Sequence, residues 1–189
     1  MALNPSNVRV GSGENGHVYL APIGTTAPID LTTAWAPAWV DLGYLSDDGV
    51  EMEYSTDTED IMAWQSLNPI RKVLTSVDLT LAFTAIELKS RAVTAYFPDS
   101  TITEVTPGTV FRLDIPAAPG PAEYAFGFEW HDGDIDHRVV IPRGEVTDRE
   151  SVTFERGEPV GLGMTASAYA SSVPELAIWL SNDPSWAPA

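Results

Sequence analysis

The sequence predicts a mainly β fold, because turn residues divide it into short segments and the clearest segments alternate as strands do. Fifteen prolines and fourteen glycines are spread along the 189 residues, a punctuation found in sandwiches and barrels rather than in helical bundles. Segments Gly49–Tyr54 and Val73–Phe83 alternate apolar and polar side chains. Successive side chains on a strand point to opposite faces, so each segment is expected to bury one face and to wet the other.

The other strands are expected where apolar runs lie between turn residues. Glycines between Gly11 and Gly16 predict the turn of a first hairpin formed by Val8–Val10 and His17–Ala21, and Thr25–Pro37 is expected to be a loop. The apolar run Leu176–Leu180 predicts a strand or turn docked on a neighbour. Further strands are expected at Trp39–Leu42, Val110–Ile115, Tyr124–Trp130, His137–Val146, Ser151–Phe154 and Val160–Tyr169.

One helix is expected, over Ala85–Tyr96. The preceding Thr84-Ala-Ile-Glu87 matches a capping box, in which a hydroxyl and a carboxylate satisfy free backbone amides reciprocally. Pro98 would stop the helix.

The most informative stretch runs from Asp41 to Asp60 and holds eight acidic and no basic residues. From Val50 the even positions Val50, Met52 and Tyr54 are apolar, whereas the odd positions, apart from Ser55, carry carboxylates. A strand here would bury one face and present a row of carboxylates on the other. Such rows are often plain solvated faces, but this one lacks the basic residues that normally intersperse on a surface. The members of the row are Glu51, Glu53, Asp57 and Glu59.

Between the two alternating strands lies a segment of about eighteen residues, Ser55–Lys72, which is too long for a hairpin turn. Long loops in compact domains are usually functional or ordered by a partner. It carries Met62 and Trp64 and ends with Arg71 and Lys72. We expect Trp64 to lie at an interface.

Composition excludes several classes of function. Ten basic and 27 acidic residues give a net charge of −17, which argues against ordinary nucleic-acid binding, where basic side chains displace counterions from phosphates. The chain has no cysteine, hence no disulfide, thiolate metal site or cysteine nucleophile. It has no signal-peptide pattern and no apolar run of membrane-spanning length, so a cytoplasm-like compartment and no membrane partner are expected.

Motifs that resemble catalytic or metal sites fail on inspection. The segment Gly11–Gly16 matches a dinucleotide fingerprint, but a β-like run ending in Pro22 follows it instead of a helix. The acids of His131–His137 repeat the first ligand spacings of a calcium loop, yet His137 and Arg143 stand where Gly and Glu are required. A hairpin turn at Asp132-Gly133 explains this segment better. We therefore expect no enzyme, catalytic residue, metal or cofactor.

Several segments resemble the major tail proteins, or tail-tube proteins, of long-tailed phages with non-contractile tails, particularly those that infect actinobacteria. The resemblance lies in Gly16–Pro28, in Trp39–Val50, in the helix after Thr84 and in Arg138–Asp148. It covers nearly the whole chain in the order of its elements.

The resemblance implies a β-sandwich or split barrel with one flanking helix, a single tail-tube domain over 1–189 and no C-terminal immunoglobulin-like domain. It further implies hexameric rings stacked into a tube that conducts DNA. The carboxylate row would then face the lumen, and the long loop would reach the next ring through Met62, Trp64, Arg71 and Lys72. Implied partners are copies of the chain, the tape-measure protein, the tail terminator and distal tail proteins, and double-stranded DNA that passes without specific binding. The location would be the virion tail, after assembly in the host cytoplasm.

Other readings remain open on the residues alone. A soluble β-sandwich binding module, recognising carbohydrate or protein through exposed tryptophans, would share much of this pattern. A contractile-tail tube or a prophage-derived particle would also look similar.

Overall fold

The computed structural model describes residues 4–188 and is mainly β with one α-helix, as the sequence predicts. Its helical elements are η1 (Pro5–Asn7), α1 (Ser90–Tyr96) and η2 (Pro184–Trp186). Its strands are β1 (Ser12–Pro22), β2 (Val40–Asp41), β3 (Leu45–Ile61), β4 (Arg71–Ala85), β5 (Thr101–Thr106), β6 (Val110–Asp114), β7 (Glu123–Asp132), β8 (Ile135–Arg149), β9 (Leu162–Ala168) and β10 (Ile178–Ser181). Eight strands form one antiparallel sheet in the order β2-β1-β7-β8-β9-β4-β3, with β10 paired to β8, and β5 and β6 form a separate hairpin.

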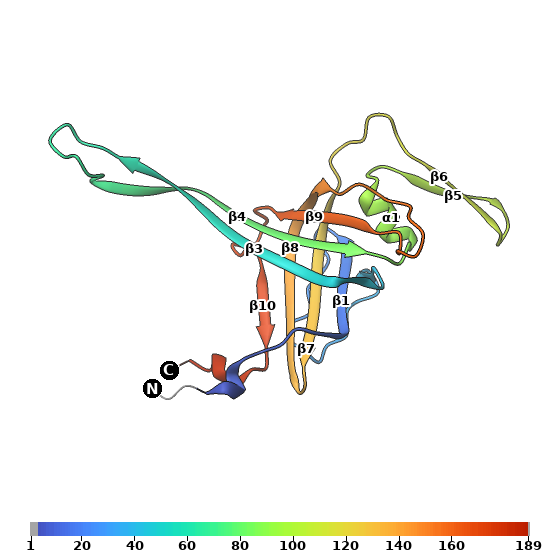
Figure 1. Ribbon diagram of the computed structural model, residues 1–189, viewed down its shortest axis with the longest axis horizontal. Helices are drawn as coiled ribbons and strands as arrows, with labels where there is room; N and C mark the ends of the chain where they lie inside the picture. Colours follow the sequence, from blue (N-terminus) through green and yellow to red (C-terminus); the bar gives the residue numbers. More distant parts are fainter. Residues whose placement is uncertain (1–3, 189) are drawn as a thin grey trace.

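The main sheet folds over on itself and encloses the core (Figure 1). β8 joins the two halves, because residues 135–145 pair with β7 and residues 144–149 pair with β9. Core side chains come from both halves and include Val18, Leu20, Phe126, Ile141, Leu81, Phe83 and Met164. The sheet is not closed, since β2 pairs only with β1 and β3 only with β4. The fold is that of an open sandwich, as expected.

The alternation predicted for β4 is confirmed in its second half. Leu79, Leu81, Phe83 and Ala85 are buried, and the residues between them are exposed or half-buried. The corresponding prediction for β3 is wrong beyond Val50: Met52 and Tyr54 are exposed, because β3 and β4 leave the body of the molecule together and no layer covers them.

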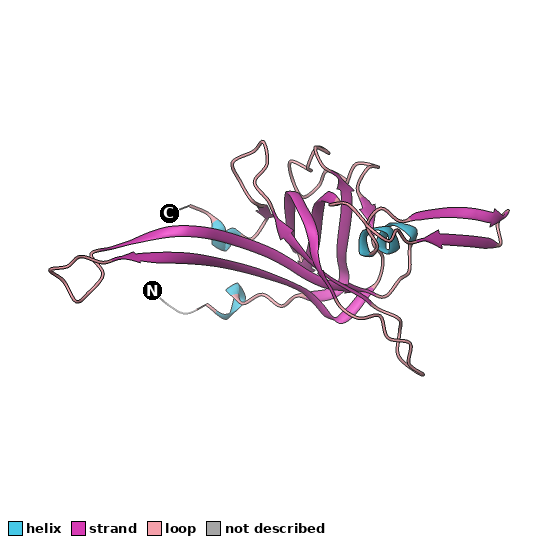
Figure 2. Cartoon of the chain, turned by 90° about the horizontal axis from the view of Figure 1, so that it is seen from above, coloured by secondary structure: helices cyan, strands magenta, loops and turns pink. Residues whose placement is uncertain are grey.

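The predicted loop over 55–72 is mostly strand. β3 continues to Ile61 and β4 starts at Arg71, so that only nine residues, 62–70, connect them. The two strands stay paired along this length, with one register shift between Asp57 and Thr58. The result is a long two-stranded arm that projects from the body (Figures 1 and 2).

The predicted helix is shorter than expected and its capping box is wrong. The helix begins at Ser90, after Lys89, which makes no side-chain cap hydrogen bond. Thr84 still belongs to β4 and pairs with Gly163 of β9, so its backbone is committed to the sheet. The Glu87 carboxylate instead accepts a hydrogen bond from the backbone N–H of Tyr44.

Several predicted strands differ at their ends or do not form. The first hairpin is wrong: Val8–Val10 is not a strand, and β1 pairs with β2 and β7. Ser151–Phe154 is irregular, whereas β5 was not expected. The apolar tail run gives β10, which docks on β8 of the same chain. The expected turn at Asp132-Gly133 connects β7 and β8, with Gly133 at a positive φ of 63° that suits glycine.

Both ends of the described chain meet at this β7–β8 turn (Figure 1). Arg9 Nε lies 2.5 Å from Asp183 Oδ2, and this ion pair holds the pKa of the Asp183 carboxyl well below its usual range. The Val10 N–H donates to Asp132 Oδ2 at 3.2 Å, and the Asn182 side chain donates to the Asp134 carbonyl at 3.0 Å. The segments near the two termini are thereby clasped together.

A buried ion pair fixes the loop between β1 and β2. The Arg138 guanidinium bonds Glu129 at 2.9 Å and donates to the carbonyls of Asp30 and Thr33, both at 2.8 Å. The Trp35 ring stacks under the guanidinium and over Gly127, where a Cβ would lie 2.4 Å from the ring. The loop therefore sits on the sheet in one position.

Candidate functional site: the β3–β4 arm

The arm consists of two strands that hold only each other over much of their length. β9 pairs with β4 from Thr80 to Ala85, and the rest of β4, from Arg71, is bonded to β3 alone. The outer edge of β3 has no partner strand among residues 4–188. Unpaired edges of this kind are templates for pairing with another chain.

One face of the arm carries the predicted row of carboxylates. Residues opposite each other in an antiparallel pair lie on the same face, so the register places this face across both strands. Glu51 faces Ala82, Glu53 faces Thr80, Asp57 faces Ser76 and Glu59 faces Val73. All four acids are exposed, and none forms an ion pair within residues 4–188. Glu51, Glu53, Asp57 and Glu59 are called the carboxylate face from here on.

β4 adds a fifth carboxylate to this face, Asp78, which lies opposite Ser55. The Ser76 hydroxyl lies 3.0 Å from Asp57 Oδ2 and 3.3 Å from Asp78 Oδ2, so it connects the acids of the two strands. Asp78 could have been found from the sequence, because it has the parity of the wet positions of β4. The face thus concentrates negative charge over two strands.

The opposite face of the arm is largely apolar and uncovered. Thr58 faces Leu74 and Tyr54 faces Leu79. Leu79 belongs to the core, but Leu74 is exposed and Tyr54 is 65% exposed. The arm is therefore amphipathic, with carboxylates on one face and exposed apolar side chains on the other. Toward the tip this second face also carries the Asp60–Lys72 ion pair.

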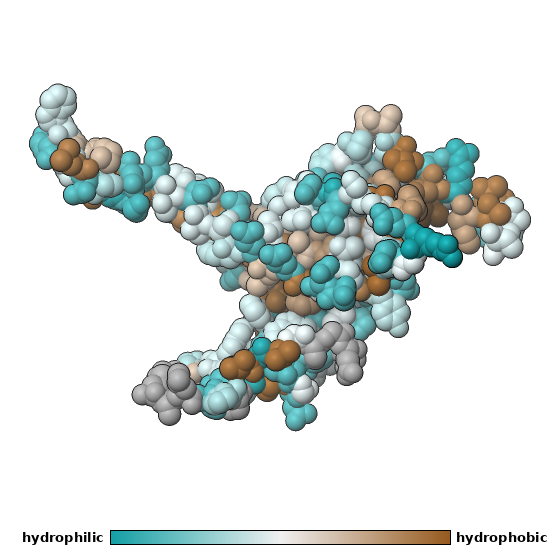
Figure 3. Space-filling view, viewed as in Figure 1, coloured by the Kyte–Doolittle hydropathy of each residue, from teal (hydrophilic) through white to brown (hydrophobic). Residues whose placement is uncertain are grey.

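The tip of the arm, residues 61–72, exposes large apolar side chains. Trp64 is 99% and Leu67 98% exposed, and Ile61, Met62 and Ile70 are also exposed. The tip is nevertheless folded by its own bonds: the Ile70 N–H donates to the Ile61 carbonyl at 2.9 Å, and the Ser66 hydroxyl donates to the Asn68 carbonyl at 2.8 Å. Figure 3 shows the brown side chains at this end of the molecule.

The two basic residues at the tip have different surroundings. Lys72 Nζ lies 2.9 Å from Asp60 Oδ1 of the same arm, and both side chains are largely exposed. Arg71, opposite Ile61, has no ion pair within the described part of the chain. Within the tip, Arg71 is therefore the cation that remains for a partner.

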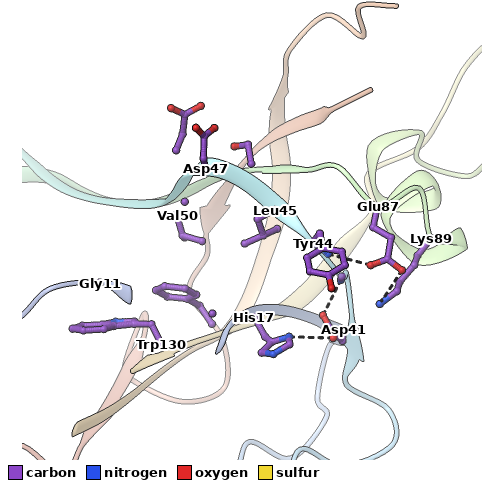
Figure 4. Close-up of a pocket in the computed structure, with 16 residues that line it drawn as sticks. Gly11, His17, Asp41, Tyr44, Leu45, Asp47, Val50, Glu87, Lys89 and Trp130 are labelled. Atoms are coloured by element: carbon purple, nitrogen blue, oxygen red, sulfur yellow. Dashed lines mark hydrogen bonds and ion pairs between the residues drawn. The ribbon is translucent and has the colours of Figure 1, made fainter. Parts of the chain in front are cut away.

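A hollow of about 800 Å³ lies where the main sheet fails to close, between β1 and β2 on one side and the start of β3 on the other (Figure 4). His17 Nδ1 lies 3.2 Å from Asp41 Oδ2, and Glu87 lies 3.6 Å from Lys89 on the opposite rim. These pairs tie the rim together and present no nucleophile next to a base. Across residues 4–188, three or more potential metal ligands do not come together anywhere, and the described helices are too short or too polar to span a membrane.

The tryptophans other than Trp64 pack within the body or against its terminal segments. Trp39 is buried, and Trp35 packs against it and Tyr19. Trp130 stacks on His137, and Trp179 contacts the same ring. Among the tryptophans that the structure describes, Trp64 is the one whose side chain is almost fully exposed.

Comparison with known proteins identifies the family. No curated protein matches the chain. A family model described as "Phage tail tube protein" matches residues 1–189, the whole chain. The chain therefore belongs to the phage tail tube protein family and is a structural protein of a phage tail.

Proposed function

We propose that the chain assembles as hexameric rings that stack into the tail tube and form the conduit for DNA ejection. The observation that carries this proposal is the arm, whose carboxylate face, apolar face and exposed tip have no covering layer in the described chain. In a monomer, this two-stranded ribbon leaves its edges and its apolar face in water. A tube would bury these edges and this face between copies.

The carboxylate face is proposed to line the lumen, because an acidic wall repels DNA phosphates and cannot hold the DNA by counterion release. Lining it with Glu51, Glu53, Asp57 and Glu59 gives a bore in which double-stranded DNA passes without specific binding. Asp78, which lies opposite Ser55 on the same face, extends this acidic wall onto β4.

Ring closure is proposed to use the free edge of β3. Its backbone groups would pair with a strand of the neighbouring copy, so that the arms of six copies form a closed inner barrel. Closure would also cover Met52 and Tyr54, which are exposed in the single chain.

The tip is proposed to contact the adjacent ring. Met62 and Trp64 would be buried there, with Arg71 placed against an acid and Lys72 kept at the contact by Asp60. Trp and Arg are the residues that most often carry interface energy.

The wider role follows from this assembly. We propose that residues 1–189 act as a single tail-tube domain without catalytic activity, located in the virion tail after assembly in the host cytoplasm. The tape-measure protein, the tail terminator and the distal tail proteins are its proposed partners beside copies of itself.

Negative-stain electron microscopy of the purified chain at high concentration tests the assembly. We expect hollow tubes or stacked rings. A variant in which residues 56–76 are replaced by a short turn should remain monomeric and folded. Tubes from that variant would refute the role of the arm, and a wild-type chain that stays monomeric while binding a carbohydrate would favour a soluble binding module.

A further inference from the structure

The β5–β6 hairpin is a second projection, at the end of the molecule opposite the arm (Figures 1 and 2). β5 and β6 pair with each other and with no other described strand. An isolated two-stranded hairpin is marginally stable in water and gains stability from packing on another surface. The positions of the apolar side chains on the hairpin show which of its two faces would pack against another surface.

The two faces of this hairpin differ in character. On one face Ile102 lies opposite Leu113, and Glu104 lies opposite Phe111, which is 63% exposed. On the other face Thr103 and Thr101 lie opposite Arg112 and Asp114, which form an ion pair at 2.6 Å. The first face presents apolar side chains around a single carboxylate. The second face is suited to water around this ion pair, and Val110, next to the turn, is its exposed apolar residue on β6.

The arm tip matches this first face in both polarity and charge. Residues 62–72 contain two basic and no acidic side chains, and Lys72 is already paired with Asp60. Arg71 therefore stands beside exposed apolar residues without an ion pair in the described chain. Glu104, which accepts a hydrogen bond from the Gly108 N–H, likewise has no ion pair within residues 4–188. Each surface thus holds one unneutralised charge of opposite sign next to an exposed aromatic ring.

The geometry also suits a repeating contact. The two surfaces lie at opposite ends of the longest axis, and Figure 3 shows hydrophobic side chains at both ends. A contact between two different surfaces of one chain repeats head to tail, so it closes a ring or extends a filament.

We propose that the arm tip of one copy docks on the apolar face of the β5–β6 hairpin of another copy, with Trp64 packed against Phe111 and Arg71 paired with Glu104. This inference rests on the proposed function, since it names the partner surface of the arm. The second copy belongs to the adjacent ring. The contact connects the two copies through their projections, the arm and the β5–β6 hairpin, rather than through their bodies.

A charge exchange tests the pairing. Arg71→Glu and Glu104→Lys should each lower tube yield roughly tenfold, because close interfacial charge pairs couple by factors of that size. The double variant should assemble to within about twofold of wild type under. A matched exchange on the wet face, Arg112→Glu with Asp114→Lys, should leave yield unchanged, and thermal unfolding should show that all variants are folded. A double variant no better than its single parents would overturn the pairing.

Cross-linking identifies the partner directly, because the chain has no cysteine of its own. Gln65→Cys places a thiol beside Trp64, and Ile102→Cys places one on the same face of the hairpin as Phe111, and neither change removes these two rings. Tubes grown from an equal mixture of the two variants should give dimers with a short bismaleimide, whereas tubes of either variant alone should not. Tubes that form without the mixed dimer, or that link Ile102→Cys only to itself, would overturn this inference and leave the tube proposal standing. A wild-type chain that forms no tubes would overturn both.

Discussion

The Nε1–H of Trp179 donates a hydrogen bond to Nδ1 of His137 at 3.1 Å, and this bond fixes the imidazole as the neutral tautomer with its proton on Nε2. The ring is 3% exposed and is stacked on Trp130, with Trp186 at its edge. Burial lowers the pKa of His137, and the positive charge of Arg9 lowers it further. The carboxylates of Asp183, Asp136 and Asp132 raise this pKa but do not outweigh the burial.

Stability should therefore fall as the pH is lowered from neutral. Below the ordinary His pKa of about 6.5 the unfolded chain binds a proton that the folded chain excludes, so stability is complete above that pH and is lost as pH falls toward the lowered pKa. The loss is at most about 1.4 kcal/mol per pH unit, or roughly 3 °C in Tm. Thermal unfolding by tryptophan fluorescence between pH 8 and pH 5 measures it. His137→Phe should remove much of this slope and His131→Gln should retain it; an unchanged slope in His137→Phe would refute the assignment.

Removing the Arg138 side chain should destabilise the fold strongly. Arg138→Met leaves the half-buried Glu129 without its cation and with hydrogen bonds from Tyr19 and Trp35 alone. Breaking a buried pair typically costs about 3–5 kcal/mol, which corresponds to roughly 10 °C in Tm. Calorimetry measures the change. The exposed pair Arg112–Asp114 provides the control, since Arg112→Met should change stability by less than about 1 kcal/mol. Similar Tm values for the two variants would contradict the role given to the buried pair.

Reversing the charge of the carboxylate face should slow DNA delivery and leave the fold intact. Glu51→Lys with Glu53→Lys puts cations where phosphates would pass, and cations bind DNA by releasing its counterions. Infectivity and the rate of DNA ejection from particles built with the variant measure the effect. Glu155→Lys with Glu158→Lys makes the same change of charge in the exposed irregular segment 150–161, and should have little effect. Normal ejection by the Glu51/Glu53 variant would remove these residues from the lumen.

Moderate salt should favour assembly. Each copy carries −17, so that six copies carry −102 in one ring. Raising ionic strength from about 0.01 M to 0.15 M shortens the Debye length from about 30 Å to about 8 Å, which screens this repulsion more than it weakens short contacts. Tube mass from sedimentation should rise over this range. A falling mass would show that attraction between opposite charges, not lumen repulsion, dominates assembly.

The sequence predicted the structure best where the signal lay within a single strand or a single turn. The alternation of β4 predicted its buried residues, and Asp132-Gly133 predicted the β7–β8 turn, because both signals are local. The carboxylates at alternate positions of β3 also lie together on one exposed face, as the sequence predicts.

The errors have a common physical origin in contacts that the local sequence does not show. Thr84 satisfies a capping pattern, but pairing with Gly163 claims its backbone for the sheet. Residues 55–61 read as an acidic loop, yet cross-strand bonds to β4 keep them extended without burial. The parity of Asp78 marks it as a wet position of β4, but only the register with β3 places it on the carboxylate face. The β5–β6 hairpin was missed because its significance depends on its place at one end of the molecule.

Cryo-electron microscopy of the assembled tube, at a resolution that shows side chains, would locate the carboxylate face and Trp64 relative to the bore. We expect a hollow tube in which the carboxylate face of every copy points into the bore, while Trp64 is buried against another copy. A tube with these carboxylates on its outer surface, or with Trp64 exposed to solvent, would contradict this expectation.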